Sequence, residues 1–349
     1  MDQSSLRDSR SFYSFPGIEM PGYFQRSLPG PRRHTVGHLI FSHGCQFAKK
    51  RPAMRLFTRA FLIVPLLCLN NAMAAPPMNP NLENYTLTYD TPADPGLQGQ
   101  LENIDANLRA KYGMTTNQTS LGLLDLRTLR LAAIYPDRED YAASVAKIGI
   151  LFAYFDLHPD AATNLDAQTR HELGLMIKPS SNEMAAKYSQ MLGLKQIEKA
   201  LTSYGFYDAS HGGGIWVGKH YGVTGERIGD PVGDNSHAVT VRQVLRFYLL
   251  MEQGKLISPA ASRTMREIFA SPDIPAENIK FVKGLEGRNL EILRKSGTWE
   301  NWLHDSAIIT GPNRCYILVA LTNHPKGDDY LADLAVQVDN LMIQEAGAR

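Results

Sequence analysis

The sequence predicts an α+β fold in which strands from both ends of the chain form one sheet and a helical subdomain is inserted between them. Three observations predict this arrangement. Two strand-like runs follow an N-terminal helical pattern, helical patterns then fill the segment from 144 to about 270, and three more strand-like runs precede a last helix. We find no internal repeat and no low-complexity tract.

Each element has its own signal in the chain. Leu97, Leu101, Ile104 and Leu108 have the spacing of an amphipathic helix, which we expect to end at Gly113. The strand-like runs "SLGLLDL" and "RLAAIYP" are close enough to form a hairpin. Inside the insert, three segments end at or near glycine: "NEMAAKYSQMLG", "LKQIEKALTSYG" and "TVRQVLRFYLLMEQG". The later strands are "EILRKSG", "WLHDSAIIT" and "CYILVALTN", and the last helix is "DDYLADLAVQVDNLMIQEA".

Composition and charge exclude several classes of function. The 349 residues are 44% hydrophobic and 20% charged, as in an ordinary globular protein. A net charge of +1 and the lack of a Lys/Arg block exclude general attraction to nucleic acid or anionic lipid. The sequence has no zinc-ligand spacing, phosphate-binding loop or dinucleotide fingerprint. We therefore expect no metal, no cofactor and no nucleic-acid partner.

The first 74 residues have the pattern of a leader rather than of a folded domain. The stretch "MRLFTRAFLIVPLLCLNNAMAAPP" has an arginine-bearing start, an apolar run and a small-residue site, so we interpret 54–74 as a secretory signal peptide cleaved after Ala74. Residues 1–53 lack periodicity, and we interpret them as an upstream extension outside the native protein. The folded domain is then 75–349, which we expect to be secreted and without a membrane anchor.

Cysteine usage permits an oxidising compartment without requiring one. Cys68 lies within the leader, and the bulky Leu67 before it argues against lipid attachment. Cys315 then remains alone, so it has no internal disulfide partner. It lies in a β-branched apolar run, where we expect a buried structural thiol.

The stretch "YAASVAKIGILFAYF" places Ser144 and Lys147 in an otherwise apolar run. On a helix, this spacing puts both side chains on one face. A lysine removed from water has a lowered pKa and can act as general base toward a serine. Taken alone, the pattern favours a helix start whose lysine reaches solvent. The apolar residues expected to hold this helix in the core are Val145, Ile148, Phe152 and Phe155.

Two further motifs follow in order along the chain. "KPSSNEMA" places Ser180 and Asn182 just before a helix, where Ser180 with Glu183 could instead form a capping box. "RKSGT" places Lys295, Ser296, Gly297 and Thr298 at a strand end, which could instead be an ordinary entry into a turn. Each of the three motifs is weak evidence alone. They are informative together because they follow one another in a set order, at one helix start, at a second helix start and in a late strand.

With these motifs the chain resembles the penicillin-recognising serine hydrolases, and class A β-lactamases in particular. The resemblance covers nearly the whole region after the leader. It implies an antiparallel sheet flanked by N- and C-terminal helices, with the helical subdomain inserted at about 144–270.

The resemblance also implies a role for each motif residue. Ser144 would be the nucleophile, with Lys147 as its base or proton relay, and Ser180 would pass a proton to the leaving nitrogen. Asn182 would bind the substrate amide. Lys295, with Ser296 and Thr298, would bind the substrate carboxylate. The oxyanion hole would consist of the backbone N–H groups of Ser144 and Thr298.

The chain departs from class A β-lactamases in one stretch. These enzymes carry a Glu-x-x-x-Asn motif whose glutamate activates the water that releases the acyl group. The glycine-rich segment 211–239 has no such motif. Glu226 is its one glutamate, and Asp230 and His237 are the other candidates for a base, although each has the simpler interpretation of a solvated loop residue.

Taken together, the sequence predicts a secreted, periplasmic serine hydrolase, monomeric and acting on a β-lactam or a cell-wall peptide. β-Lactamase is the first hypothesis. A D-alanyl-D-alanine peptidase or esterase with the same acylation chemistry is the second. A non-catalytic protein that binds cell-wall fragments is the third.

Overall fold

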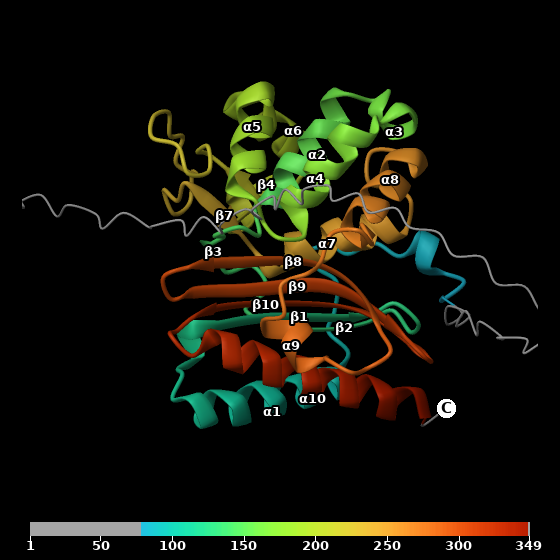
Figure 1. The fold of residues 1–349 in the computed structure, drawn as a ribbon. Helices are drawn as coiled ribbons and strands as arrows, with labels where there is room; N and C mark the ends of the chain where they lie inside the picture. Colours follow the sequence, from blue (N-terminus) through green and yellow to red (C-terminus); the bar gives the residue numbers. More distant parts are fainter. Residues whose placement is uncertain (1–77, 348–349) are drawn as a thin grey trace, which may run out of the picture. The chain divides into compact units, whose positions relative to one another are not determined.

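A computed structural model describes residues 78–347, and the predicted extension 1–53 and signal peptide 54–74 lie outside the described residues. Between 78 and 347, a central sheet lies between two helical layers (Figure 1). The N-terminal and C-terminal helices cover one face, and the inserted helices cover the other. The predicted α+β class is therefore confirmed. No helix in this part of the chain is both long and apolar enough to span a membrane.

The central sheet is antiparallel and joins the two ends of the described chain, in the order β2-β1-β10-β9-β8. The predicted hairpin pairs along Leu121–Asp125 and Arg130–Ile134, and β1 pairs with β10 from Thr119 to Asp125. β8 forms one edge, so one side of the Lys-Ser-Gly-Thr stretch is free to meet the inserted subdomain. The strands are β1 Thr119–Asp125, β2 Arg130–Ile134, β8 Glu291–Trp299, β9 Trp302–Gly311 and β10 Arg314–Asn323.

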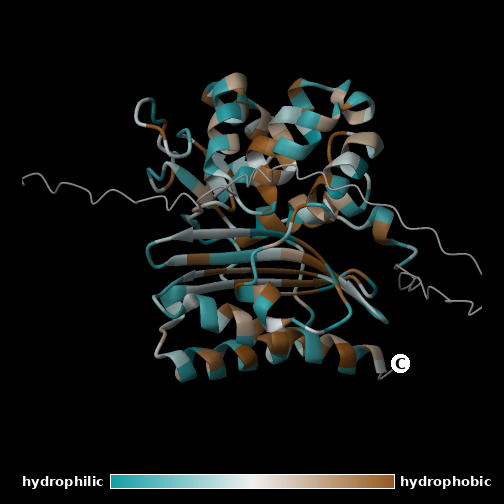
Figure 2. Cartoon of the chain, viewed as in Figure 1, coloured by the Kyte–Doolittle hydropathy of each residue, from teal (hydrophilic) through white to brown (hydrophobic). Residues whose placement is uncertain are grey.

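Alternation of side chains along the strands produces a hydrophobic core on each face of the sheet. In β10, Ile317, Val319 and Leu321 pack toward the inserted helices, whereas Leu318 and Ala320 pack toward the terminal ones. Figure 2 shows hydrophilic residues along the outer helices and hydrophobic residues between helices and sheet. Cys315 is buried as expected, and burial raises the pKa of its thiol to about 12.

The terminal helices form as predicted. Asp94 caps the first helix by accepting a hydrogen bond from the Leu97 N–H at 2.8 Å, and Gly113 ends it with a φ of 72°. That left-handed conformation favours glycine, which explains why the helix stops there. The helices are α1 Pro95–Tyr112 and α10 Gly327–Gly347.

The inserted subdomain is mainly helical but contains a small sheet. The glycine-rich segment 211–239 is not structureless. It forms short strands, and one of them pairs with the residues that precede Ser144. The helices are α2 Lys147–Leu157, α3 Ala161–Asn164, α4 Ala167–Ile177, α5 Asn182–Leu192, α6 Leu194–Ser203, α7 Val241–Glu252, α8 Pro259–Ala270 and α9 Lys280–Gly284. The short strands are β3 Asp140–Tyr141, β4 Tyr207–Asp208, β5 Gly213–Gly214, β6 Trp216–Val217 and β7 His237–Val239.

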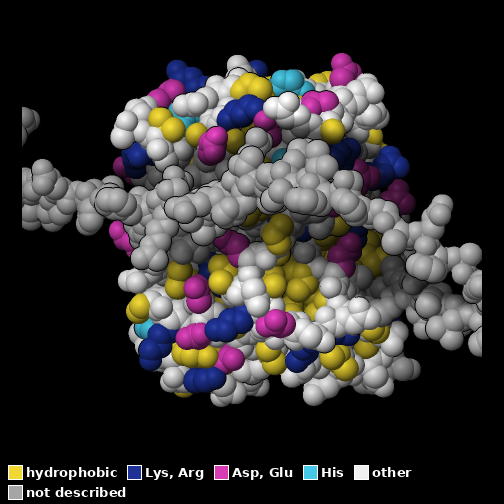
Figure 3. Space-filling view, viewed as in Figure 1, with side chains coloured by type: hydrophobic (Ala, Val, Ile, Leu, Met, Phe, Trp, Pro, Cys, Tyr) yellow, Lys and Arg dark blue, Asp and Glu magenta, His cyan; other side chains and the backbone are white. Residues whose placement is uncertain are grey.

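Charges on the surface are mixed. On the face drawn in Figure 3, Lys and Arg side chains are interspersed with Asp and Glu side chains on both helical layers. This mixture agrees with the near-zero net charge of the sequence.

Candidate active site

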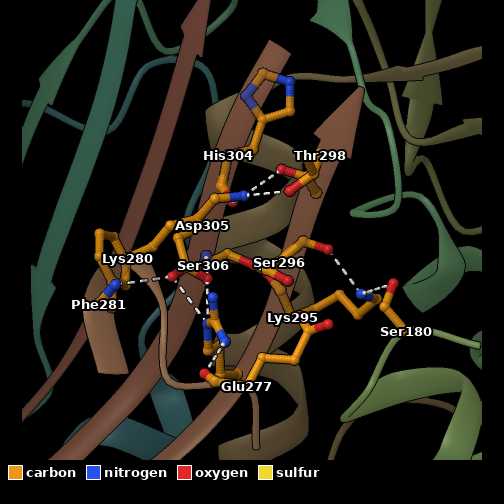
Figure 4. Close-up of polar contacts among 12 residues, drawn as sticks. Ser180, Glu277, Lys280, Phe281, Lys295, Ser296, Thr298, His304, Asp305 and Ser306 are labelled. Carbon is orange, nitrogen blue, oxygen red and sulfur yellow. Dashed lines mark hydrogen bonds and ion pairs between the residues drawn. The ribbon is translucent and has the colours of Figure 1, made fainter. Parts of the chain in front are cut away.

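The three motifs meet where the inserted subdomain faces the edge strand β8. Lys147 begins α2, Ser180 lies in the turn before α5, and Lys295 lies in β8. The Ser180 hydroxyl joins them, because its Oγ accepts hydrogen bonds from Lys147 Nζ at 3.1 Å and from Lys295 Nζ at 2.8 Å. Lys295, 115 positions after Ser180 in the chain, therefore binds the same hydroxyl as Lys147 (Figure 4 shows the bond between Lys295 and Ser180).

Lys147 is fully buried, so the alternative of a lysine reaching solvent is wrong. Its Nζ also donates to the Ser180 carbonyl at 2.5 Å and to Asn182 Oδ1 at 2.8 Å. Burial lowers the pKa of Lys147 to about 7, against the opposing effect of the Glu277 charge. An amine with this pKa is neutral in a large fraction of molecules near neutral pH and can accept a proton.

Lys295 is fully buried beside the same hydroxyl. Its Nζ donates a second hydrogen bond to the Ser296 carbonyl at 2.6 Å. Burial lowers the pKa of Lys295 well below its usual value, and the charge of Lys147 lowers it further. Two ammonium groups on one hydroxyl repel each other, so the pair favours a state in which at most one of the two amines is protonated to the charged form.

Ser180 does not cap α5. The capping residue is Ser181, whose Oγ accepts a hydrogen bond from the Met184 N–H at 3.2 Å, so the capping-box alternative for Ser180 is wrong. Ser180 has a φ of 59°, in the left-handed region that serine rarely adopts. Such a conformation costs about 1–3 kcal/mol and persists where the surroundings fix it. Here the carbonyl and hydroxyl of Ser180 are both bound by Lys147.

Ser144 lies in the turn before α2 rather than on the helix. The Lys147 N–H donates to the Ser144 carbonyl at 3.3 Å, and α2 begins at Lys147 itself. The half-buried Ser144 hydroxyl makes no hydrogen bond within residues 78–347, and Lys147 Nζ is directed to Ser180 and Asn182 instead. The expectation that Ser144 and Lys147 share a helix face is therefore wrong in detail, although they remain one turn apart.

The Ser144 turn packs directly against β8. A Cβ atom added to Gly297 would lie 3.2 Å from the Ser144 backbone N and 2.9 Å from the Ala142 carbonyl oxygen. Only glycine allows this approach without a shift of the backbone. The backbone N of Ser144 therefore lies close to Gly297, the residue that precedes Thr298 in β8.

The remaining predicted residues of the third motif differ in their surroundings. Ser296 is nearly buried in β8, whereas Thr298 is exposed at its end. Thr298 Oγ1 accepts a hydrogen bond from Lys280 Nζ at 2.7 Å, a contact that no motif predicted (Figure 4). Asn182 is exposed, and its Oδ1 is bound by Lys147.

The structure does not bring Glu226 into this cluster. Glu226 is exposed and makes no ion pair or hydrogen bond within the described part of the chain. The Asp230 carboxylate accepts hydrogen bonds from Tyr207 Oη and from the backbone N–H groups of Val232 and Gly233, at 2.8–2.9 Å. It therefore closes a turn of the loop and does not face Lys147.

His237 does not supply the missing base either. Burial lowers its pKa to about 4, and its Nε2 lies 3.0 Å from the Lys219 carbonyl oxygen, so that nitrogen carries the proton. Beside Lys147 lies Tyr221, whose ring centroid is 4.6 Å from Nζ. Tyr221 is nearly buried, and its hydroxyl donates to the Ala143 carbonyl at 2.9 Å.

Sequence reasoning missed Tyr221 and Lys280. Both stand in segments without a motif, "KHYG" and "NIKFVKG", and each meets the site only through tertiary packing. Among residues 78–347, no group of three or more His, Cys, Asp or Glu side chains is arranged to hold a metal ion.

Comparison with solved structures shows the same fold. The β-lactamase from Sphaerobacter thermophilus DSM 20745 superposes with a TM-score of 0.56 at 15% identity, over 70% of this chain and 97% of that chain. PBP-A superposes with a TM-score of 0.54 at 17% identity, over 73% of this chain and 99% of that chain. An ancestral class A β-lactamase gives 0.56 at 19% identity, over 69% and 99%.

Sequence comparison identifies the family. A search of curated proteins finds no match. The profile of the β-lactamase enzyme family matches residues 159–344, more than half of the chain, and this segment includes Ser180 and Lys295. The protein therefore belongs to the β-lactamase enzyme family.

Proposed function

We propose that this protein is a secreted, periplasmic serine hydrolase that forms an acyl-enzyme on Ser144 with a β-lactam or a D-alanyl-D-alanine peptide. We further propose that it releases the acyl group slowly. The observation that carries the proposal is the Ser180 hydroxyl held between the buried amines of Lys147 and Lys295. Family membership supports the reaction class, and the geometry supports the assignment of roles.

Acylation would proceed through this cluster. Ser144 Oγ attacks the substrate carbonyl while its proton passes to neutral Lys147. As the carbon–nitrogen bond breaks, the leaving nitrogen takes a proton from Ser180 Oγ, which is replaced from Lys147 at 3.1 Å. Lys295, 2.8 Å from the same oxygen, keeps the hydroxyl in place. Each proton transfer by a positioned group accelerates such a step by about 10²–10⁴-fold.

The substrate would be held along β8. The backbone N of Ser144 lies close to Gly297, the residue before Thr298, and the N–H groups of Ser144 and Thr298 would bind the oxyanion. The positive charge of Lys295, with the hydroxyls of Ser296 and Thr298, would bind the substrate carboxylate. Asn182 is exposed, its Oδ1 is bound by Lys147, and its amide nitrogen would bind the substrate amide.

Slow release is supported by the surroundings of Lys147. Deacylation needs a water molecule and a base close to the ester. Tyr221 occupies the side of Lys147 with an apolar ring, Glu226 is exposed to solvent, and Asp230 is committed to its own turn. We therefore favour an acylated state that persists, as in a peptidase inhibited by penicillin, over rapid β-lactam turnover.

A time course with a chromogenic cephalosporin tests the proposal. The full chain is mixed with the cephalosporin while absorbance and intact mass are recorded together. We expect a burst in which each protein molecule releases one molecule of coloured product. One covalent adduct per protein molecule should persist after this burst. Ser144→Ala should abolish both, whereas Ser210→Ala, which removes an exposed loop serine, should leave both unchanged.

The other outcomes separate the alternatives. Sustained colour with only a transient adduct would make the protein a turning-over β-lactamase and overturn slow release. Colour without any adduct in the wild type would contradict acylation. Neither colour nor adduct would favour the non-catalytic binding hypothesis.

A further inference from the structure

A third buried lysine, outside the three motifs, lies behind the proposed oxyanion site. Lys280 is the first residue of α9 and is fully buried, with a φ of 52°. Its Nζ donates to the Gly297 carbonyl at 2.6 Å, to Thr298 Oγ1 at 2.7 Å and to the His304 carbonyl at 3.2 Å (Figure 4). An ammonium has three N–H donors, and all three are used here. Lys280 therefore has no donor left for a substrate and acts on β8 itself.

Two of these acceptors belong to the part of β8 that faces the Ser144 turn. The Gly297 carbonyl and the Thr298 N–H form one planar peptide group, in which they point in opposite directions. Lys280 binds the carbonyl end, so the N–H end is directed away from it. A hydrogen bond from a cation to the carbonyl draws electron density from the peptide nitrogen and makes its N–H a stronger donor.

The charges around Lys280 leave this polarisation in place. Burial lowers its pKa, and Asp305 and Asp328 oppose that shift. Asp305 is bound to Arg294 at 2.7 and 2.8 Å, and its Oδ2 also accepts from the Phe281 N–H at 3.1 Å. Asp328 Oδ1 is 3.7 Å from Lys280 Nζ, too far for a hydrogen bond. The shortest contacts of the ammonium are therefore with Gly297 and Thr298.

We propose that Lys280 is a positioning residue that holds and polarises the Gly297–Thr298 peptide, and so strengthens the Thr298 N–H as an oxyanion donor. This inference rests on the proposed function. Lys280 would increase the rate of acylation without touching the substrate. Its effect would appear in the transition state and in the acyl-enzyme carbonyl more than in the initial binding of substrate.

The test compares Lys280→Met with Lys283→Met in the full chain. Lys283 lies on the same short helix, is exposed, and pairs with Asp329 at 3.6 Å. Acylation by benzylpenicillin is followed by rapid-quench mass spectrometry, and the ester carbonyl of the acyl-enzyme by infrared difference spectroscopy with carbonyl-labelled penicillin. Measurements at 10 °C use only protein whose circular dichroism matches the wild type. Lys280→Gln, which keeps hydrogen-bond donors without the charge, is the second variant.

We expect Lys280→Met to lower the acylation rate constant by about tenfold or more, because one weakened oxyanion donor is worth a fraction of the 10²–10³-fold effect of a donor removed. The dissociation constant for penicillin should change less. The ester carbonyl band should move to higher frequency, with Lys280→Gln intermediate and Lys283→Met unchanged.

Two results would overturn the inference. One is a wild-type carbonyl band in a folded Lys280→Met or Lys280→Gln acyl-enzyme. The other is a slower variant whose whole defect lies in substrate binding. A wild type that forms no adduct would instead refute the proposed function, so the two failures are distinguishable.

Discussion

At the scale of residues, the main feature of the site is a serine hydroxyl that accepts hydrogen bonds from two lysines. Lys147 and Lys295 are both buried, and both donate to Ser180 Oγ. Burial of an unpaired ammonium is unfavourable by several kcal/mol, so a fold that keeps two of them together does so for a reason other than stability. The pKa of Lys147, lowered to about 7, is suited to proton transfer near neutral pH.

The pKa of Lys147 predicts the pH dependence of acylation. Because Lys147 must be neutral to accept the proton of Ser144, the rate constant for acylation should rise with pH and level off above a midpoint near pH 7. Lys147→Met should lose on the order of 10²-fold or more in rate. Lys187→Met, at an exposed lysine paired with Glu172, should behave as wild type. A flat profile between pH 5 and pH 9 would refute the role of Lys147.

Tyr221 gives a second prediction at this scale. Tyr221→Ala should admit water beside Lys147, raise the pKa of that amine, move the midpoint of the acylation profile to higher pH and shorten the life of the acyl-enzyme. Tyr221→Phe keeps the ring and should lose only about 1 kcal/mol of unfolding free energy, for the hydrogen bond to Ala143. Tyr135→Ala, at an exposed tyrosine, is the control. If the pH profile of acylation were unchanged in Tyr221→Ala, the Tyr221 ring would not influence the pKa of Lys147.

At the scale of elements, the sequence predicted most helices and strands because their signals are local. The apolar spacing of Leu97, Leu101 and Leu108 is the buried side of α1, and Gly113 ends that helix. Local signals failed where tertiary contacts decide the conformation. Ser180 has the sequence of a capping box, but Lys147 fixes it with a positive φ and Ser181 caps α5 instead.

The close approach of β8 to the Ser144 turn can be tested through glycine. Gly297→Ala places a methyl group 2.9 Å from the Ala142 carbonyl oxygen, so strand and turn must separate. The acylation rate should fall by about tenfold or more as the two oxyanion donors move apart. Gly99→Ala, in α1 with no atom within 4 Å, should leave acylation unchanged and stabilise the fold by up to about 1 kcal/mol. If Gly297→Ala were acylated as fast as Gly99→Ala, the rate would not depend on the close approach of β8 to the Ser144 turn.

At the scale of the whole molecule, the site is assembled from both layers of the fold. The edge strand β8 contributes Lys295 and Thr298, and the inserted subdomain contributes Ser144, Lys147 and Ser180. The order of the motifs allowed this convergence to be predicted. Lys280 and Tyr221 could not be predicted, because a lone lysine or tyrosine has no pattern and its position depends on packing between distant segments.

The glycine-rich loop is fastened to the rest of the subdomain by a pair of carboxyl groups, which gives a pH-dependent stability. Burial and the neighbouring Asp230 raise the pKa of Glu139 to about 8. Between pH 4.5 and about 8 the folded chain therefore keeps a proton that the unfolded chain releases, so stability falls as pH rises through this range.

A substitution that removes the titrating carboxyl group of Glu139 should increase stability by an amount that depends on pH. Relative to the wild type, Glu139→Gln should melt at a temperature that is higher by more at pH 8.5 than at pH 5.5. Glu226→Gln, at an exposed glutamate of the same loop, should show no such difference. A Glu139→Gln shift that is equal at the two pH values would contradict the raised pKa.

The residue that carries the covalent adduct shows directly whether Ser144 is the nucleophile. The full chain is incubated briefly with benzylpenicillin, quenched in acid and digested with trypsin, which releases the peptide "EDYAASVAK" with Ser144 as its single serine. We expect that this peptide alone gains the mass of penicillin and that fragmentation places the mass on Ser144. An adduct on any other peptide, or no adduct at all, would contradict the assignment of Ser144 as the nucleophile.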